Sequence, residues 1–400
     1  MSKLMPIEQA LDRILFEARS PCAIETVPLL QALERILATA VEATIDVPGE
    51  DNSAMDGYAL RASDASAKLT VAQRIPAGAL GEQLAEGTAA RIFTGAAVPS
   101  GADAVVMQED CRELDGCITA PSEIEAGQHI RPRGQDIRCG ETLLSPGRRL
   151  RPQDLGLLAS VGCERVEVYR PLRVAIMSTG DELVDPGEPL TPGRIYNSNR
   201  YTLTGLLQAL GCEVVDCGIV PDDARATAQA LADAASVADC VISSGGVSVG
   251  EEDHVKAQVE SLGALSVWKL AIKPGKPLAF GHVCGTPFLG LPGNPSSVFV
   301  TFVLIARPFL LRLQGGEEPT LPALYACSDF TVTRPGGRRE YLRVTVVDVE
   351  GQLYARRFDN QSSGILSSVC YSNALAVIPA GETVAIGDSI EVVLLDTLTG

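Results

Sequence analysis

The stretch from residue 171 to 315 constrains the fold most, because it alternates regularly between strand-like and helix-like segments. Short apolar runs predict strands, and apolar residues that recur every three or four positions predict amphipathic helices. We expect strands at 172–178, 213–220, 238–244, 264–270 and 286–291, and helices at 199–210, 222–235, 255–262 and from 294 onward. Such alternation predicts a three-layer α/β domain with a mostly parallel sheet, whose ligands bind at the carboxyl ends of the strands.

The loop after the third of these strands has the most informative chemistry. Residues 238–255 form a strand pattern, a loop with Gly245, Gly246 and Gly250, and the start of a helix pattern. Backbone N–H groups close to a helix N-terminus favour a phosphate or another oxyanion. Glu251, Glu252 and Asp253 stand at the same place, and three carboxylates repel an anion unless a cation lies between them. The loop therefore predicts a divalent metal together with a phosphate-bearing ligand.

A second acidic pair follows the first strand of the same domain. Asp181 and Glu182 end the segment Met-Ser-Thr-Gly-Asp-Glu at 177–182, and their oxygens are ligands that Mg²⁺ prefers. The alternative is that they only cap a turn or a helix start. Because Asp253 follows a neighbouring strand, we expect Asp181, Glu182 and Asp253 to converge on one Mg²⁺.

Two further loops follow strands of this domain. Lys273 and Lys276 lie in Lys-Pro-Gly-Lys-Pro, whose prolines and glycine fix the chain path and hold both ammonium groups toward an anion. The alternative is a solvated surface turn. Leu-Pro-Gly-Asn-Pro at 291–295 closes a strand and opens a helix with Asn294 as N-cap and Pro295 at the first helical position. Capping alone explains that junction, and its position makes it a candidate site.

The remaining chain predicts three more units. Residues 1–46 contain a helix pattern from Pro6 and another over 30–38, and residues 134–170 return to them, so that this first domain is discontinuous. Residues 47–133 form a β-rich domain with turn signals at Asp56-Gly57 and Thr94-Gly95, and 316–400 form a small β-barrel or sandwich after the α/β domain at 171–315. Asp56 on its own predicts a turn residue.

Composition excludes several classes of function. Fifty acidic and 33 basic residues give a net charge of −17, which disfavours nucleic-acid binding through counterion release. Eleven cysteines without a CxxC motif are typical of cytosolic thiols, and the three histidines lack zinc-ligand or catalytic-triad spacing. The N-terminus lacks the apolar core of a signal peptide, and no apolar run reaches 18 residues. We expect a cytoplasmic protein without membrane spans.

With these residues identified, the chain resembles the MoeA family of molybdopterin molybdenumtransferases, which includes the gephyrin E domain. The resemblance extends from about residue 7 to 398. It rests on NSAMDGYAL (52–60), FTGAAVPSGADAVVMQED (93–110), RPRGQDI (131–137), MSTGDEL (177–183), IYNSNR (195–200), SSGGVSVGEED (243–253), KPGKPLAFG (273–281), LPGNP (291–295), and SSGIL with SNALAVIP in the last domain. Glu34 stands where many members have glycine, and Gln361-Ser362-Ser363-Gly364 replaces a more glycine-rich turn.

The resemblance implies a homodimer of four-domain subunits with a MogA-like α/β domain, an N-terminal domain that dimerises and a C-terminal β-barrel. The implied reaction is Mg²⁺-dependent insertion of molybdate into adenylylated molybdopterin with release of AMP, in a cleft between the α/β domain and the partner's β domain. The catalytic residues that it implies are Asp56, Thr94, Asp136, Glu182, Asp222 and Asp253, with Asp181, Glu182 and Asp253 on the metal. The substrate-binding residues are Ser244, Gly245, Gly246, Ser248, Lys273, Lys276, Pro292, Pro295 and Arg131.

Two other functions remain as alternatives. Adenylyl transfer to molybdopterin fits the α/β domain alone, but the loop at 245–248 is Gly-Gly-Val-Ser, where adenylylating relatives tend to have Gly-Gly-Thr-Gly. The second alternative is that the protein is a gephyrin-like scaffold without catalytic activity. Further partners implied are a MogA-type adenylyltransferase and molybdoenzymes, and nucleic acid and membrane are not expected.

Overall fold

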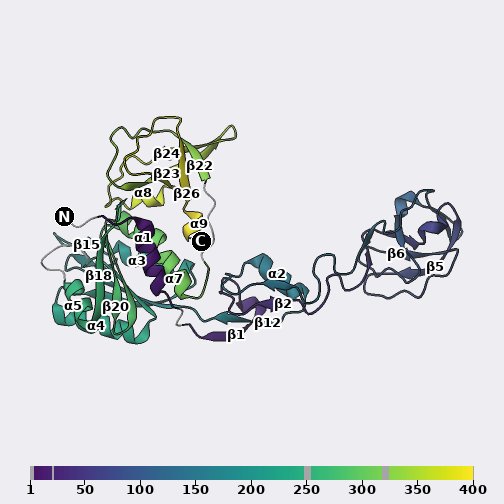
Figure 1. The fold of residues 1–400 in the computed structure, drawn as a ribbon, viewed down its shortest axis with the longest axis horizontal. Helices are drawn as coiled ribbons and strands as arrows, with labels where there is room; N and C mark the ends of the chain where they lie inside the picture. The colour runs from purple at the N-terminus through teal and green to yellow at the C-terminus, as the bar shows by residue number, and fades with distance from the viewer. Residues whose placement is uncertain (1–3, 20–21, 247–253, 318–323, 400) are drawn as a thin grey trace.

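The computed structural model describes residues 4–19, 22–246, 254–317 and 324–399. The molecule is elongated, with the α/β domain and the C-terminal β-barrel at one end and the β-rich domain at the other (Figure 1). A narrow domain built from two separate parts of the chain joins them.

The α/β domain contains a six-stranded mixed sheet in the order β16-β13-β17-β21-β20-β18. Its strands are β13 (Arg173–Thr179), β16 (Glu213–Val220), β17 (Cys240–Ser244), β18 (Gly263–Lys269), β20 (Pro277–Val283) and β21 (Thr286–Leu291). The first four strands in the order are parallel, and β20 is antiparallel to both of its neighbours. The expected mostly parallel sheet is confirmed, but the sequence pattern did not identify β20.

Helices cover both faces of this sheet, because residues along a strand alternate in direction. Ala175 and Met177 of β13 share a core with α4 (Ala224–Val237) and α5 (His254–Leu262). Val174 and Ile176 share the other core with α1 (Ile7–Glu17), α3 (Ser198–Ala209), α6 (Pro295–Thr301) and α7 (Arg307–Leu313). The N-terminal helix α1 therefore packs on the α/β domain.

One helix in the described part of the chain is long and apolar enough to cross a membrane by length and composition. It spans Pro295–Leu313, including a π-helical segment at Phe302–Ala306, with a mean hydropathy of 1.6. Within this window 89% of the residues are buried inside the protein. That burial is typical of the core helix of a globular domain.

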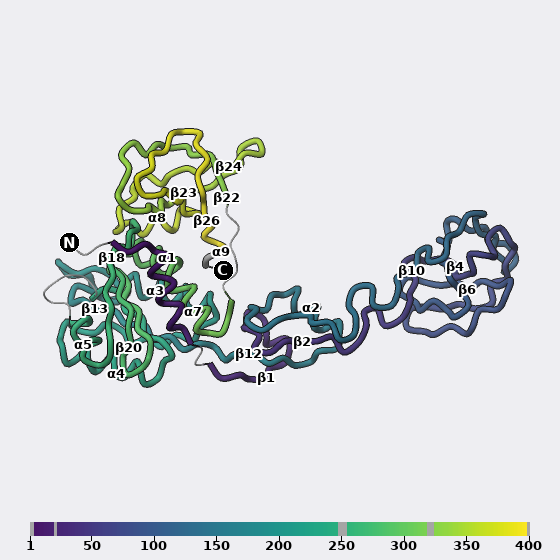
Figure 2. The backbone as a smooth tube through the Cα atoms, viewed as in Figure 1, coloured from purple at the N-terminus to yellow at the C-terminus, as the bar shows by residue number. Residues whose placement is uncertain are grey.

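The narrow connecting domain is made of two chain segments that pair with each other. Strand β1 (Ile24–Pro28) is antiparallel to β12 (Arg165–Tyr169), and β2 (Val41–Glu42) to β11 (Thr142–Leu144) (Figure 2). Helix α2 (Pro152–Ser160) contributes Leu158 to their small apolar core. Two separate chain segments thus form one unit here, whereas α1, which the expected bounds 1–46 included, belongs to the core of the α/β domain.

The helix that we expected at 30–38 was wrong. Residues Leu29–Gln31 form a single 3₁₀ turn, and Glu34 has a φ of 64°, which a continuing helix cannot accommodate. Leu30 is 89% exposed, whereas Ile36 and Leu37 bridge to Arg149 and Val168. Ile36 and Leu37 are therefore apolar because they lie in an extended segment buried against neighbouring strands, and not because they share a helix face.

The β-rich domain has a six-stranded sheet in the order β7-β4-β6-β5-β9-β8. Its strands are β4 (Gly57–Leu60), β5 (Lys68–Ile75), β6 (Thr88–Ile92), β7 (Ala104–Met107), β8 (Arg112–Leu114) and β9 (Cys117–Thr119). At its root β3 (Asn52–Ser53) pairs with β10 (Ile130–Arg131), so the chain enters and leaves side by side.

The C-terminal unit is a closed five-stranded barrel, which confirms the expected fold class. Strand β23 pairs with both β24 and β25, and the order β23-β24-β22-β26-β25 closes the ring. The strands are β22 (Leu324–Ser328), β23 (Arg339–Val349), β24 (Gln352–Arg357), β25 (Ala374–Ile378) and β26 (Ser389–Leu394), with short helices α8 (Ser367–Cys370) and α9 (Asp396–Thr399). A two-residue strand, β19 (Ile272–Lys273), extends from the α/β domain to pair with β23.

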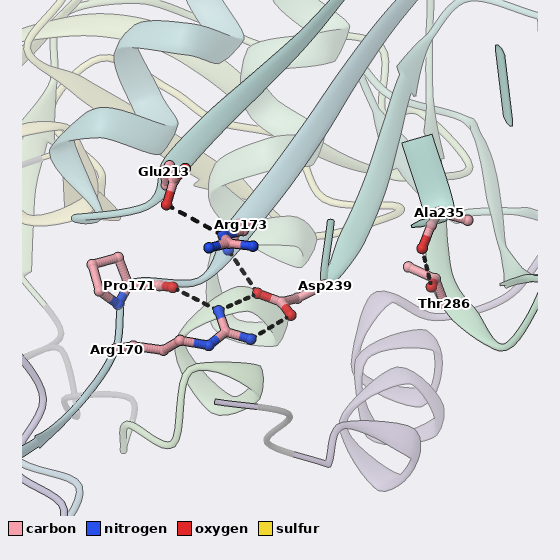
Figure 3. Close-up of polar contacts among 7 residues, drawn as sticks. All are labelled: Arg170, Pro171, Arg173, Glu213, Ala235, Asp239 and Thr286. Carbon is pink, nitrogen blue, oxygen red and sulfur yellow. Dashed lines mark hydrogen bonds and ion pairs between the residues drawn. The ribbon is translucent and has the colours of Figure 1, made fainter. Parts of the chain in front are cut away.

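The junction between the connecting domain and the α/β domain is held by charge (Figure 3). The Arg170 guanidinium donates two hydrogen bonds of 2.7 Å to the carboxylate of Asp239, which also accepts the Arg173 N–H at 2.8 Å. Burial alone would raise the pKa of Asp239, but these bonds lower it below its usual range. The pair fixes the turn between β12 and β13.

Candidate functional site

A cavity of about 460 Å³ lies at the carboxyl edge of the sheet, where the expected loops meet. Its walls come from the ends of β13, β17 and β21 and from the start of β20 and α3. The lining residues are Thr179, Glu182, Leu183, Ile195, Tyr196, Asn197, Ser198, Asn199, Ser244, Gly245, Gly246, Pro277, Pro292, Gly293, Asn294, Pro295 and Ser297. Glu182, Ser244, Gly245, Gly246, Pro292 and Pro295 are residues that the sequence singled out, and the structure brings them together.

Glu182 is placed by an excursion between β13 and α3 that contains β14 (Leu183–Val184) and β15 (Ile195–Tyr196). Gly180 has a φ of 141°, and a Cβ there would collide with the Glu182 carboxylate, which folds back over it. Arg200 anchors the excursion, since it donates to Asp185 at 2.7 Å and to Asp216 of β16 at 2.6 Å. The side chain of Glu182 is therefore directed to the cavity wall.

Asp181 and Asp222 meet beside the same edge. The backbone N–H of Asp181 donates to the Asp222 carboxylate, and that of Asp222 to the Asp181 carboxylate, both at 3.3 Å. Within the described ranges, neither acid nor Glu182 forms an ion pair with a lysine or arginine. Adjacent carboxylates without a counter-ion attract a cation.

The glycine-rich loop is described only up to Gly246, so Ser248 and Asp253 lie outside the described residues. Gly246 has a φ of 66°, and a Cβ on it would be 2.5 Å from Cγ2 of Val255 and 2.9 Å from Oγ1 of Thr179. The Gly245 N–H donates to the Leu291 carbonyl at 3.2 Å. The loop is therefore tied to β21 at Gly245, and the N–H groups expected to bind an anion beyond Gly246 lie outside the described residues.

Three asparagines of the cavity were missed as site residues, although two belong to the IYNSNR segment. Asn197 caps α3 by accepting the Arg200 N–H at 3.2 Å, and Asn199 donates to the Gly293 carbonyl at 2.8 Å. Asn294 does not cap its own helix with its side chain, but donates to Ser363 Oγ of the C-terminal unit at 3.0 Å. Capping patterns hid Asn197 and Asn294, because N-cap asparagine has a sufficient local explanation, whereas the partner of Asn199 is far away in the sequence.

The two lysines have different surroundings. Lys273 is paired with Glu340 of the barrel at 3.1 Å, so its charge is already compensated. Lys276 is exposed and directly precedes Pro277 of the cavity wall, and no ion pair of Lys276 occurs among the residues that the structure describes. Lys276 is thus the better placed of the two for an anionic ligand.

Asp56 and Thr94 form a separate site in the β-rich domain. The backbone N–H and the hydroxyl of Thr94 donate to Asp56 Oδ1 at 2.7 and 2.8 Å. These two bonds, with a smaller effect of the Arg91 charge, lower the pKa of the Asp56 carboxyl. In one chain the β-rich domain that contains this pair lies at the opposite end of the molecule from the α/β domain that contains the cavity (Figure 1).

Arg131 and Asp136 line a third place, at the root of the β-rich domain. They share a depression of about 500 Å³ with Val47, Pro48, Asn52 and Gln135. The structure thus divides the expected residues among three places in one chain.

Of the expected Mg²⁺ ligands, Asp181 lies beside the cavity and Glu182 on its wall. Within residues 4–19, 22–246, 254–317 and 324–399, no three His, Cys, Asp or Glu side chains converge as a metal site. Asp181, Glu182 and Asp222 nevertheless supply the oxygen donors that Mg²⁺ prefers, without a competing cation in the described part. The donor chemistry fits Mg²⁺, and Asp253, the further expected ligand, is outside the described residues.

Three family profiles match most of the chain. They are described as the MoeA N-terminal region (domain I and II) at 5–162, a probable molybdopterin binding domain at 175–312 and the MoeA C-terminal region (domain IV) at 326–395. A molybdopterin molybdenumtransferase of Haemophilus influenzae is 41% identical over 396 residues, which cover 96% of this chain and 98% of the relative. The chain belongs to the MoeA family. It is therefore an enzyme of molybdenum cofactor biosynthesis.

Other members of the MoeA family agree over nearly the full length. The molybdopterin molybdenumtransferase of Nostoc is 40% identical over 90% of this chain and 86% of its own. A solved MoeA protein of Pyrococcus horikoshii superposes with a TM-score of 0.85 at 31% identity and covers 98% of this chain and all of its own. Another solved structure from the same organism gives a TM-score of 0.80 at 35% identity, over 98% and 99% of the two chains. The elongated four-part architecture is thus that of the family.

Proposed function

We propose that this MoeA protein catalyses Mg²⁺-dependent insertion of molybdate into adenylylated molybdopterin, with release of AMP. The observation that supports it most is that Glu182 on the cavity wall and the mutually bonded Asp181 and Asp222 have no cationic partner in the described part of the chain. A substrate that brings phosphate to this edge needs a cation between the two sets of negative charge.

The cavity suits the pterin part of the substrate. About 460 Å³ falls within the usual range for small-molecule pockets. Pro277, Pro292 and Tyr196 offer apolar surfaces to a planar ring, while Asn199, Ser244 and Ser297 offer polar groups to its edge. The exposed Lys276 stands next to this wall for an oxyanion.

Asp181 and Glu182, with Asp253, are the residues that would hold Mg²⁺. When bound there, the ion would neutralise phosphate charge and favour departure of the AMP group. The reciprocal bonds between Asp181 and Asp222 hold the two loops together, so that the strand ends beside the cavity keep a fixed arrangement.

We further propose that the protein acts as a homodimer in which the partner's β-rich domain completes the cleft. The support is that the β-rich domain, which contains Asp56 and Thr94, lies at the opposite end of its own chain from the α/β domain that contains the cavity (Figure 2). Arg131 and Asp136 at the domain root would approach the same cleft. A MogA-type adenylyltransferase would supply the substrate in the cytoplasm, and molybdoenzymes would accept the product.

The test is release of AMP from adenylylated molybdopterin in the presence of molybdate and Mg²⁺. Glu182→Gln should lower the rate by at least about a hundredfold, because a positioned carboxylate is lost from the reacting edge. Glu188→Gln is the matched control, since it removes a charge from the same excursion outside the cavity. Chelation of Mg²⁺ should stop AMP release in the wild type.

Unchanged turnover by Glu182→Gln, or turnover that persists after chelation, would contradict the proposal. Formation of adenylylated molybdopterin from ATP, Mg²⁺ and molybdopterin would instead favour the adenylyltransferase alternative. Wild-type protein that does neither would favour the scaffold.

A further inference from the structure

Two arginines stand side by side on the sheet of the β-rich domain. The parallel register of β5 and β6 places Arg74 beside Arg91, and the register of β4 and β6 places Tyr58 on the other side of Arg91. The three side chains therefore form one row on one face of the sheet. Like charges on neighbouring strands repel each other, so the pairing of Arg74 with Arg91 lowers the stability of the sheet.

An aromatic ring holds both guanidinium groups. Their central carbons lie 4.5 Å (Arg74) and 4.7 Å (Arg91) from the centroid of Phe93, and Arg91 is also 5.2 Å from the ring of Tyr58. Contacts of this kind attract a cation to the face of a ring and limit its motion. The guanidinium groups are therefore pre-positioned, as a binding site requires.

The charges of this row are not neutralised within the described part of the chain. Arg91 donates to the Gly57 carbonyl at 2.9 Å and to Gln108, which are neutral acceptors. Arg74 is exposed, and neither arginine has a carboxylate within 4.0 Å among the described residues. In a chain with a net charge of −17, two uncompensated cations on one face form a local anion-attracting patch.

The patch adjoins the Asp56–Thr94 pair. Phe93 directly precedes Thr94, and Gly57, whose carbonyl Arg91 binds, directly follows Asp56. The Arg91 charge also contributes, after the Thr94 hydrogen bonds, to the lowered pKa of the Asp56 carboxyl. A group bound by the two arginines would therefore lie next to residues that we assign to the reaction.

We propose that Arg74 and Arg91, stacked on Phe93, bind the phosphate of the AMP portion of the substrate and position it beside Asp56 and Thr94. The inference rests on the proposed function, and it assigns the β-rich domain a phosphate-binding role. Guanidinium groups suit this role because they donate two parallel hydrogen bonds to phosphate oxygens. Inorganic phosphate and molybdate share the tetrahedral oxyanion chemistry, so the experiment must separate them from AMP.

The experiment is calorimetric titration of the full-length protein with AMP. Arg74→Gln should weaken AMP binding about tenfold, because a charge-assisted contact to phosphate is lost. Arg74→Lys should give an intermediate affinity, since it keeps the charge but loses the planar fork. The matched control is Arg112→Gln, an exposed arginine on β8 of the same sheet outside the row, which should bind AMP as the wild type does.

Parallel titrations with inorganic phosphate and with molybdate identify the anion. Weaker binding of AMP and of inorganic phosphate in Arg74→Gln is the expected result, whether or not molybdate, which has the same oxyanion chemistry, also binds more weakly. A loss confined to molybdate, equal AMP affinities of Arg74→Gln and wild type, or no detectable AMP binding by the wild type would each overturn the inference. The melting temperature of each variant should stay within a few degrees of the wild type, which separates binding from folding.

The outcome is separable from that of the proposed function. If the wild type inserts molybdate but AMP affinity is independent of Arg74, only the inference fails. If AMP binding depends on Arg74 but molybdate is not inserted, the proposed reaction fails and the phosphate site remains.

Discussion

At the scale of single residues, carboxylates divide according to their cationic neighbours. Asp154 at the start of α2 is buried and accepts bonds from the Arg148 and Arg151 side chains and from the Arg151 N–H. Asp181 and Asp222 face each other without such partners in the described part. The first kind stabilises the fold, and the second is free to bind a ligand.

Asp154→Asn should destabilise the protein in a pH-dependent way. Burial alone would raise the pKa of Asp154, but its arginine bonds lower it from 3.8 to about 2. Because the pKa of Asp154 is lower in the folded than in the unfolded protein, its ionised carboxylate stabilises the fold fully at a pH above the unfolded-state pKa. This stabilisation is lost as the pH falls from about 4 to about 2. A shift of this size corresponds to about 2 kcal/mol at pH 7.

The measurement is the difference in melting temperature between wild type and Asp154→Asn. It should be constant from pH 7 to about pH 5 and shrink as the pH is lowered toward 3. A difference that stays constant throughout that range would mean that the charge of Asp154 is not responsible.

The site residues that could be predicted from the sequence are those that directly follow a predicted strand. Asp181, Glu182 and Gly246 follow buried strands, and parallel topology brings such ends together. Asn199 and the Arg74–Phe93 contact were not predictable, because both depend on partners far apart in sequence, at Gly293 and across β5 and β6. Local patterns do not contain such pairings.

At the scale of elements, most strands and helices of the α/β domain were predicted from periodicity. Periodicity failed at two places, strand β20 of this domain and residues 30–38 of the N-terminal part. Strand β20 begins at Pro277 directly after a turn-rich segment, and its antiparallel direction is set by pairing with β18 and β21. Residues 30–38 have helical spacing, but the left-handed Glu34 ends any helix there. Tertiary pairing outweighed the local signal in both cases.

The turn from β17 into the glycine-rich loop gives an element-scale prediction. Gly246→Ala should cost more stability than Gly285→Ala, although both glycines have positive φ values of 66° and 86°. A Cβ at Gly285 meets nothing within 4 Å, so that change costs only the backbone strain of about 1 kcal/mol. At Gly246 the collision with Val255 should raise the cost to about 2–4 kcal/mol.

Urea unfolding of the two glycine variants measures this difference, with Gly285→Ala as the matched control. Equal free energies of unfolding would show that the loop relaxes around the new methyl group. That result would contradict a rigid placement of Gly246 against Thr179 and Val255.

At the scale of the whole molecule, the dominant feature is that the β-rich domain with Asp56 and Thr94 lies at the opposite end from the α/β domain with the cavity (Figure 1). Sequence patterns indicated a discontinuous domain and a separate β-rich domain, but they could not give the extended arrangement, since that depends on the pairing of β1 with β12 and on the Arg170–Asp239 junction. The arrangement makes the proposed shared cleft testable.

Asp56→Asn and Glu182→Gln should complement each other in a mixed dimer. Each variant alone should be inactive, whereas a dimer with one copy of each, purified through two different tags, should show about half of the wild-type AMP release. This follows because one of its two shared clefts contains both wild-type residues and the other contains neither. Activity no higher than that of the single variants would show that each cleft belongs to one chain.

The paired entry and exit of the β-rich domain has a consequence for its independence. Val47 bridges to Ile137, and Asn52 pairs with Arg131, so the domain departs from the chain and rejoins it at a single point. Such a unit is an insertion in the host architecture, and a short turn that links its two ends would allow it to be removed or exchanged as a cassette. A single protease cut within either connecting segment would likewise leave the domain attached through the other.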